Sequence, residues 1–356
     1  MASYAYTLGN AGNRTNVAEL SGRSLVYGYD NDYRLMSETI TSDPGGNNGA
    51  ENYTYDAVGN RQTLTSTIPS LPGGMNYSYD ANDRLSADSY DANGNTISSA
   101  GIPNSYDFEN RMTAHGAVSI AYDGDGSRVS ETVGGTTTKF LVDSANPTHL
   151  PQVLDEIVSG SVTRTYAYGL QRISENQQIS GTWTPSFYGY DGHGNVRFLT
   201  NSAGAITDTY TYDAFGMQIA RTGTTQNVYQ YSGEWLDSNL GLYYLRARYL
   251  NHATGRFWAR DPVEGKRCCG MSFNPYLYVL DNPVNTSDPT GRDFIETFFQ
   301  YDADEVLGVM LRQTMSKAAA AFICTDIAAL WAVQNPDATY QEILLYEAYC
   351  LARLGG

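Results

Sequence analysis

Few side chains in this sequence have the types and spacing of an enzyme's reacting groups. The cysteines include no CxxC pair and all lie after residue 267, which argues against a zinc site and a disulfide framework: Cys268, Cys269, Cys324 and Cys350. The histidines are scattered, and we expect them on turns or strand surfaces: His115, His149, His193 and His252. The G-x-S-x-G, Walker and H-E-x-x-H patterns are absent. We therefore predict no cofactor and no metal.

One short segment resembles a calcium-binding loop, because Asp123, Asp125 and Ser127 alternate along it. An EF-hand loop requires glycine at its sixth position and glutamate at its twelfth. Here Arg128 is sixth and Gly134 is twelfth. A hydrogen-bonded turn is therefore favoured, and calcium binding remains the alternative.

The elements that position these side chains come from an internal repeat. The repeat begins with Tyr-Asp, and in several copies it continues as x-x-G-N-R or a variant, for example YDAVGNR at 55–61 and YDGHGNVR at 190–197. The Tyr-Asp pairs are Tyr29–Asp30, Tyr55–Asp56, Tyr79–Asp80, Tyr90–Asp91, Tyr106–Asp107, Tyr122–Asp123, Tyr190–Asp191 and Tyr212–Asp213. Such short, irregularly spaced repeats suit hairpins of unequal length.

Each residue of the repeat has a physical role. A second tyrosine often stands two positions earlier, which places both rings on one face of a strand. The aspartate can accept backbone N–H bonds and so opens a turn. A glycine three positions later suits the left-handed backbone that closes a hairpin: Gly59, Gly94, Gly126, Gly194 and Gly216. The repeat therefore encodes strand, turn and strand.

Charge and hydropathy exclude several partners. The chain has 38 acidic and 22 basic residues, a net charge of −16, so we expect no binding to nucleic acid. The N-terminus shows no signal peptide. The most apolar stretch, 318–333, is shorter than the ~20 residues of a membrane span and contains Asp326. We therefore predict no stable membrane span.

The repeats resemble those of the rearrangement-hotspot (Rhs), or YD-repeat, family. Three further segments resemble the part of the family that contains its core domain: YGYDGHGNVRFLTNSAGAITDTYTYDAFG at 188–216, YSGEWLDSNLGLYYLRARYLNHATGRFWARDP at 231–262, and NPYLYVLDNPVNTSDPTG at 274–291. The resemblance implies a mainly β fold, in which irregular hairpins form a spiral, incomplete shell around a hollow interior and the core segment closes one end. It also implies that a variable C-terminal portion, often a toxin, is carried inside the shell.

We expect three domains: a YD-repeat shell at 1–187, the core domain at 188–291 and a helical tail at 292–356. The tail shows three-to-four spacing of apolar residues and a capping box at Thr339 and Glu342, which predict a helical hairpin. Its acidic excess and lack of histidine make a nuclease improbable. Because the chain begins inside the repeat array, we expect an exposed N-terminal β-edge that can pair with another chain or with a second copy.

The resemblance assigns possible chemistry to two Asp-Pro motifs. In the family such aspartates form an aspartic-protease-like dyad that cuts the chain after the second motif, which here implies Asp261 and Asp288. Either Arg256 or Arg260 would be the supporting cation, and the cut would fall near Gly291, Arg292 or Asp293. Two carboxyls that share a proton can activate water and protonate the leaving group.

The motifs depart from the family pattern in two places. Gly265 stands one position late, and Arg292 replaces an apolar residue. We therefore expect Asp261 to be displaced and the chain to stay intact, with both Asp-Pro pairs serving only as turns.

Two functions remain open at this stage. The first is a bacterial shell that carries its own C-terminal tail as cargo, leaves the cell through a dedicated secretion system or stays on its surface, and is accompanied by an immunity or delivery protein. The second is a teneurin-like structural or adhesive module whose tail is a stabilising cap.

Overall fold

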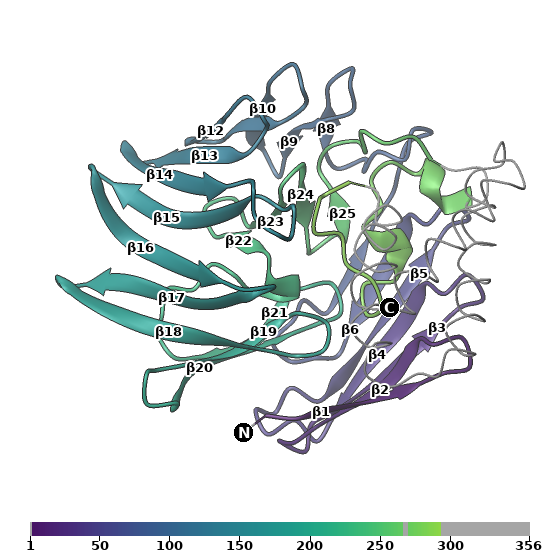
Figure 1. The fold of residues 1–356 in the computed structure, drawn as a ribbon. Coiled ribbons are helices and arrows are strands. Elements are labelled where there is room, and N and C mark those ends of the chain that lie inside the picture. The colour runs from purple at the N-terminus through teal and green to yellow at the C-terminus, as the bar shows by residue number, and fades with distance from the viewer. Residues whose placement is uncertain (1, 266–269, 293–356) are drawn as a thin grey trace, which may run out of the picture. The chain divides into compact units, whose positions relative to one another are not determined.

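The computed structural model describes residues 2–265 and 270–292 and is built almost entirely of antiparallel β-hairpins (Figure 1). Its strands form sheets of seven, fourteen and four strands, and in each sheet neighbours in space are neighbours in the chain. This order confirms the mainly β, hairpin-by-hairpin shell that the repeats predict. The helical tail predicted at 292–356 lies, from residue 293 on, outside the described residues.

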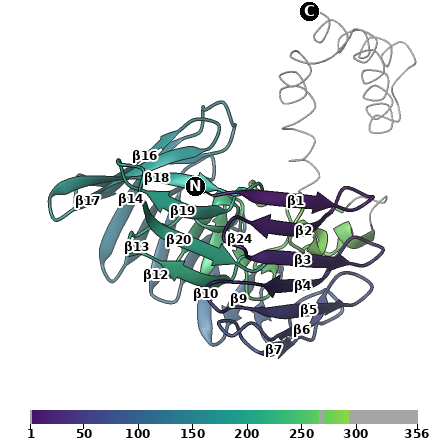
Figure 2. The same cartoon turned by 90° about the horizontal axis from the view of Figure 1, so that it is seen from below.

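The first sheet runs as a regular ladder along one side of the molecule (Figure 2). Its strands are β1 (Tyr4–Leu8), β2 (Arg14–Glu19), β3 (Ser24–Tyr29), β4 (Leu35–Thr41), β5 (Gly49–Tyr55), β6 (Arg61–Ser66) and β7 (Gly74–Asn76). The end strand β1 pairs only with β2 among the described strands, and its sequence YAYTL contains no charge or proline.

The second sheet continues the winding. Its strands are β8 (Ser89–Tyr90), β9 (Thr96–Ser99), β10 (Ile102–Tyr106), β11 (Met112–His115), β12 (Val118–Tyr122), β13 (Arg128–Val133), β14 (Thr136–Asp143), β15 (Gln152–Val158), β16 (Ser161–Tyr168), β17 (Arg172–Ile179), β18 (Thr182–Tyr190), β19 (Val196–Thr200), β20 (Ile206–Tyr212) and β21 (Gln218–Thr222). Since β18 crosses residue 187, this sheet continues through the boundary predicted there, and the domain division itself remains a prediction.

The third sheet belongs to the core segment. It consists of β22 (Trp235–Asp237), β23 (Leu242–Leu245), β24 (Arg248–Asn251) and β25 (Arg256–Phe257). Three short 3₁₀ turns accompany it: η1 (Tyr231–Gly233), η2 (Gly270–Phe273) and η3 (Val279–Asp281). Within the described ranges no helix is long and apolar enough to cross a membrane.

The repeat turn has one recurring geometry, illustrated by the second full copy. Asp56 Oδ1 accepts the N–H groups of Val58 and Asn60 at 3.0 and 2.9 Å. Gly59 has a φ of 87°, which only glycine adopts without strain. The strand register shifts immediately before Tyr55, as a bulge does. The predicted positive φ is confirmed at Gly59, Gly94, Gly126 and Gly194, and Gly216 has it as well.

Most of the repeat tyrosines bond their hairpin to an earlier one. Tyr55 Oη donates to the Leu35 carbonyl at 2.8 Å, and Tyr190 Oη donates to the Arg172 carbonyl at the same distance. The same bond is made by the hydroxyls of Tyr29, Tyr79, Tyr122, Tyr168 and Tyr212. These bonds form a ladder of hydroxyls across the strand ends, which we call the tyrosine ladder.

Removing one hydroxyl from the tyrosine ladder is expected to cost measurable stability. Tyr55→Phe keeps the ring but leaves the Leu35 carbonyl without its donor, so the free energy of unfolding should fall by about 1–2 kcal/mol. Urea denaturation measures the change. The half-exposed Tyr33 provides the control, because Tyr33→Phe should change the free energy by less than about 0.5 kcal/mol. Equal effects of the two substitutions would contradict the ladder's role.

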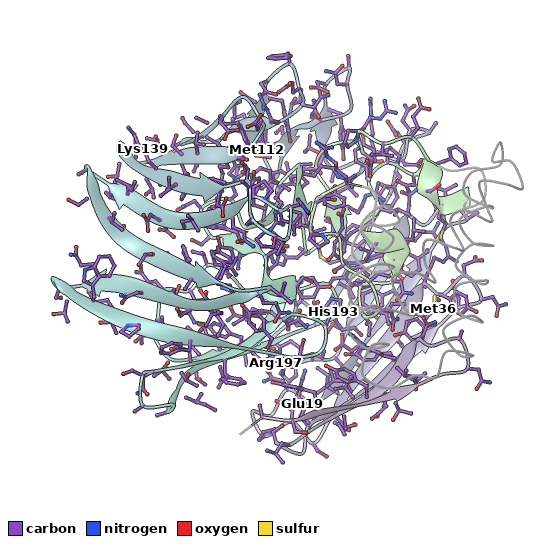
Figure 3. The ribbon with its side chains drawn as sticks, in the orientation of Figure 1. Glu19, Met36, Met112, Lys139, His193 and Arg197 are labelled. Atoms are coloured by element: carbon purple, nitrogen blue, oxygen red, sulfur yellow. The ribbon has the colours of Figure 1, made fainter. Side chains whose placement is uncertain are left out.

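The first sheet also packs onto the last hairpin of the second sheet. Ile219 of β21 is buried in a cluster with Val17, Leu25 and Ile40 of the first sheet. Arg197 on β19 forms a 2.8 Å ion pair with Glu19 on β2, and Figure 3 shows the two side chains close together. Among the described residues, the two ends of the spiral are therefore joined by side-chain contacts and not by hydrogen-bonded strands. We call this contact the seam.

The core segment packs inside the shell. Met112 and Ile120 of the second sheet share a buried cluster with Leu242 and Tyr249 of the third sheet. Arg128 on β13 fastens the two layers, because its guanidinium lies 2.7 Å from Asp237 on β22 and 4.7 Å from the centre of the Trp235 ring. The shell thus holds the core segment in place by both apolar and ionic contacts.

Candidate self-cleavage site

The structure brings both aspartates of the Asp-Pro motifs to one guanidinium. Arg248 Nη2 lies 2.7 Å from Asp261 Oδ2 and 3.5 Å from Asp288 Oδ2. Arg248 and Asp288 are both buried, whereas the Asp261 side chain is 17% exposed. The displacement of Asp261 that the late glycine led us to expect stays a prediction, although both carboxyls approach the same nitrogen. Two carboxyls of unequal solvent access therefore share a single cation.

Local sequence explains how Asp288 is held. Its Oδ1 accepts the Thr290 hydroxyl at 3.0 Å and the Arg292 N–H at 3.1 Å, as an aspartate that opens a turn does. Gly291 follows with a φ of 66°, and a β-carbon there would collide with the Leu245 carbonyl. The turn thus presents the backbone of 291–292 to the end of β23.

Arg248 also contacts the backbone that would be cut. Its Nε donates to the Gly291 carbonyl at 2.5 Å, and its Nη2 donates to the Arg292 carbonyl at 3.1 Å. The guanidinium stacks 3.6 Å from the centre of the Phe257 ring, which fixes its plane. One side chain on β24 therefore orients two carboxyls and two carbonyls.

Burial separates the two carboxyls electrostatically. It raises the pKa of Asp288 to about 6, although the Arg248 cation and the hydrogen bonds from Thr290 and Arg292 oppose the rise. Burial also lowers the pKa of Arg248, and the two aspartates counteract that shift. Asp288 thus holds a proton more readily than an ordinary aspartate, as a general acid requires.

The arginines proposed from the sequence lie elsewhere. Arg256 donates to Asn60 Oδ1 at 2.7 Å and lies over the Tyr79 ring, so it links the core to the first sheet. The Arg260 side chain lies against Gly94. Asp293 is outside the described residues. Sequence reasoning missed Arg248, whose only signal is its place in the LRARYL segment, where arginine alternates with apolar residues expected to face the core.

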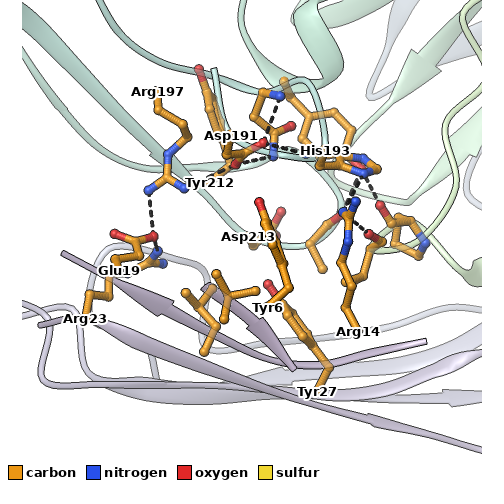
Figure 4. Close-up of a pocket in the computed structure, with 17 residues that line it drawn as sticks. Tyr6, Arg14, Glu19, Arg23, Tyr27, Asp191, His193, Arg197, Tyr212 and Asp213 are labelled. Atoms are coloured by element: carbon orange, nitrogen blue, oxygen red, sulfur yellow. Dashed lines mark hydrogen bonds and ion pairs between the residues drawn. The ribbon is translucent and has the colours of Figure 1, made fainter. Parts of the chain in front are cut away.

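The other residues that the sequence analysis singled out lie in turns or packing contacts of the fold. Asp123 Oδ1 accepts the N–H groups of Asp125 and Ser127, as in the other repeat turns. His193 lines a cavity of about 50 Å³ at the seam (Figure 4). Its ring nitrogens lie 3.3 Å from Arg14 Nη1 and from Ser232 Oγ, and burial lowers its pKa to about 4. The Ser232 hydroxyl thus lies next to a base, but the other ring nitrogen of His193 faces the Arg14 guanidinium and not the carboxylate of a catalytic triad.

Comparison with known proteins gives consistent relatives. The chain is 31% identical over 256 residues to the tRNA3(Ser)-specific nuclease WapA of Bacillus spizizenii and 30% identical over 254 residues to the tRNA nuclease WapA of Bacillus subtilis, in each case over 67% of this chain. It spans only 11% of the length of either relative. No family model matches the chain.

Solved structures show the same fold. The crystal structure of TcdB2-TccC3 superposes with a TM-score of 0.65 at 20% identity, over 82% of this chain and 17% of that one. The structure of the Photorhabdus luminescens Tc holotoxin pore gives a TM-score of 0.64 at 18% identity over the same share of each chain.

The hairpin order, the repeat turns and the enclosed core segment define a YD-repeat β-shell. With the relatives above, they identify the chain as a member of the Rhs, or YD-repeat, family.

Proposed function

We propose that this chain is the shell and core portion of a toxin-delivery scaffold, and that its core segment cuts the chain at the Gly291–Arg292 bond or the next one. One observation carries the proposal: Arg248 contacts both Asp261 and Asp288, together with the carbonyls of Gly291 and Arg292. The relatives named as nucleases support the delivery role.

The geometry suits hydrolysis of the Gly291–Arg292 bond. Arg248 Nε polarises the Gly291 carbonyl and would stabilise negative charge on its oxygen as water adds. Asp261, the more exposed carboxylate, takes the proton of that water. Asp288 lies beside the Arg292 nitrogen and gives it a proton as the C–N bond breaks. Each carboxyl has one role, set by its exposure.

The remaining parts of the proposal concern the whole protein. The segment after the cut, 293–356, would be the cargo that the shell carries. An immunity or delivery protein would accompany it, and a dedicated secretion system would export it or place it on the cell surface. The uncharged edge strand β1 would join a further strand or a second copy.

The test is the mass of the purified full chain during incubation at about pH 5 to 6, where Asp288 keeps its proton. We expect a C-terminal fragment that begins at Arg292 or Asp293. Asp288→Asn should abolish it, because an amide cannot supply the proton.

The matched control is Asp125→Asn, which changes an exposed aspartate in a repeat turn. This variant should be cut as fast as the unmodified chain. A chain that stays intact throughout, or an Asp288→Asn variant that is cut normally, would contradict the proposal. Circular dichroism of each variant shows that it is folded.

A further inference from the structure

Three buried carboxyls meet at the seam. Glu38 lies on β4, Glu51 on β5, and Asp213 in the turn between β20 and β21, with exposures of 0%, 1% and 5%. Glu38 and Glu51 are directly opposite each other in the sheet register. Like charges at such positions repel, and burial strengthens the repulsion. The cluster is therefore stable only if it carries protons.

The cluster connects two separate sheets. Glu38 Oε2 accepts the backbone N–H of Ala214 at 2.7 Å, so a side chain of the first sheet caps the turn of the last hairpin. Asp213 Oδ1 accepts the N–H groups of Phe215 and Met217 within that turn. Glu51 accepts the Tyr53 hydroxyl at 2.9 Å, and the Tyr53 ring packs 5.3 Å from Phe215. The carboxyls thus lie where the hairpin is attached.

Nearby cations do not balance the cluster. Arg61 interacts with both Glu51 and Asp213, but it also interacts with Asp281. Its guanidinium carbon lies 3.9 Å from the centre of the Phe215 ring. The cations that act on Glu38 are Arg23 and Arg197.

Both of those cations have other partners, because each also pairs with Glu19, at 2.9 and 2.8 Å. Tyrosine hydroxyls also interact with these carboxyls: those of Tyr27 and Tyr29 with Glu38, and those of Tyr53 and Tyr77 with Glu51. Each arginine near the three carboxyls thus has at least one other partner.

We propose that the cluster of Glu38, Glu51 and Asp213 is a proton-operated latch, which holds the β20–β21 hairpin against the first sheet while it carries protons and loosens it in alkaline solution. The latch does not depend on the self-cleavage site. Its proton content decides whether the two ends of the spiral stay joined.

The direction of the pH effect follows from the carboxyl environments. Burial raises the pKa of Glu38 to about 8, and it raises those of Glu51 and Asp213 as well. A carboxyl whose pKa is raised in the folded state contributes stability that is complete below its unfolded pKa and is lost as pH rises through the folded value. The seam should therefore weaken from mildly acidic pH up to and beyond about pH 8.

Hydrogen exchange of the full chain tests the latch. Protection factors, corrected for the intrinsic exchange rate, should fall about tenfold or more between about pH 6 and pH 9 in peptides that cover 207–222, since pH 9 lies about one unit above the Glu38 pKa. Peptides from β14 to β16, far from the cluster in sequence, should change less than about twofold. Equal protection of 207–222 at both pH values would overturn the proposal.

A double variant identifies the groups involved. Glu38→Gln with Glu51→Gln keeps the shapes and the acceptor oxygens but removes two of the three ionisable groups. The fall in protection of 207–222 with pH should therefore become much less steep, with Asp213 as the carboxyl that still ionises. The control Glu109→Gln changes an exposed carboxyl and should behave as the unmodified chain. A double variant that loses protection as steeply as the unmodified chain would overturn the latch. If the double variant does not fold, Glu51→Gln alone should reduce the slope, and an unchanged slope would also overturn it.

Discussion

Arg128→Met is expected to lower the free energy of unfolding by about 3–5 kcal/mol. The guanidinium lies 2.7 Å from Asp237, and both side chains are at most 3% exposed. Methionine fills much of the space between the Tyr244 and Trp235 rings but leaves Asp237 buried without its cation. The core segment should therefore separate from the shell more easily.

Urea denaturation monitored by tryptophan fluorescence measures this loss, because Trp235 lies at the contact. The control Lys139→Met removes a cation from an exposed position on β14 and should change the free energy by less than about 0.5 kcal/mol. Adding Asp237→Leu to Arg128→Met should recover much of the loss, since no unpaired charge remains. A loss below about 1 kcal/mol in Arg128→Met would show that the pair does not fasten the core.

Arg248→Lys is expected to slow cleavage by about 100-fold or more. Lysine keeps the positive charge, but a single ammonium cannot reproduce the planar fork that contacts the two aspartates and the Gly291 carbonyl. The rate of fragment formation, followed by intact mass, measures the effect. A cleavage rate within about threefold of that of the unmodified chain would show that the planar guanidinium is not needed for cleavage.

The pH profile separates a chemical role of Arg248 from a structural one. Cleavage by the unmodified chain should decline above about pH 6, where Asp288 loses its proton. Because the Arg248 cation lowers the pKa of Asp288, Arg248→Gln should move that decline to higher pH in whatever activity remains. An unmoved decline would show that Asp288 is not the titrating acid.

Local rules predicted the turns of this protein well. The repeat glycines reach positive φ, and the repeat tyrosines other than Tyr79 stand at strand ends, because both features depend on a few adjacent residues. Tyr79 makes only an isolated bridge with Leu85. One hairpin was missed: β16–β17 ends with Tyr168 and lacks the aspartate, although the Tyr166–Tyr168 pair and Arg172 were visible signals. Its tyrosine makes the ladder bond without the full motif.

The site and the seam could not be derived in the same way. Arg248 and Asp288 are 40 positions apart, and Glu38 and Ala214 are 176 apart. Their meeting depends on how many hairpins the spiral contains and how each one twists, which no local pattern encodes. The resemblance suggested the two aspartates, but the cation between them required three-dimensional placement.

The tyrosine ladder has a consequence for how such chains change length. Seven hydroxyls bond a hairpin to an earlier neighbour, as Tyr55 does with Leu35, so the contact recurs along the array. Tyr90 and Tyr106 do not make it. A gene duplication or deletion that adds or removes whole hairpins therefore preserves the bonding pattern at the new junction. The hairpins that contact each other across the seam, such as those with Glu19 and Arg197, do not tolerate such changes between them. Their side chains meet only if the number of intervening hairpins stays the same. Length variation should be rare between the hairpins that meet at the seam.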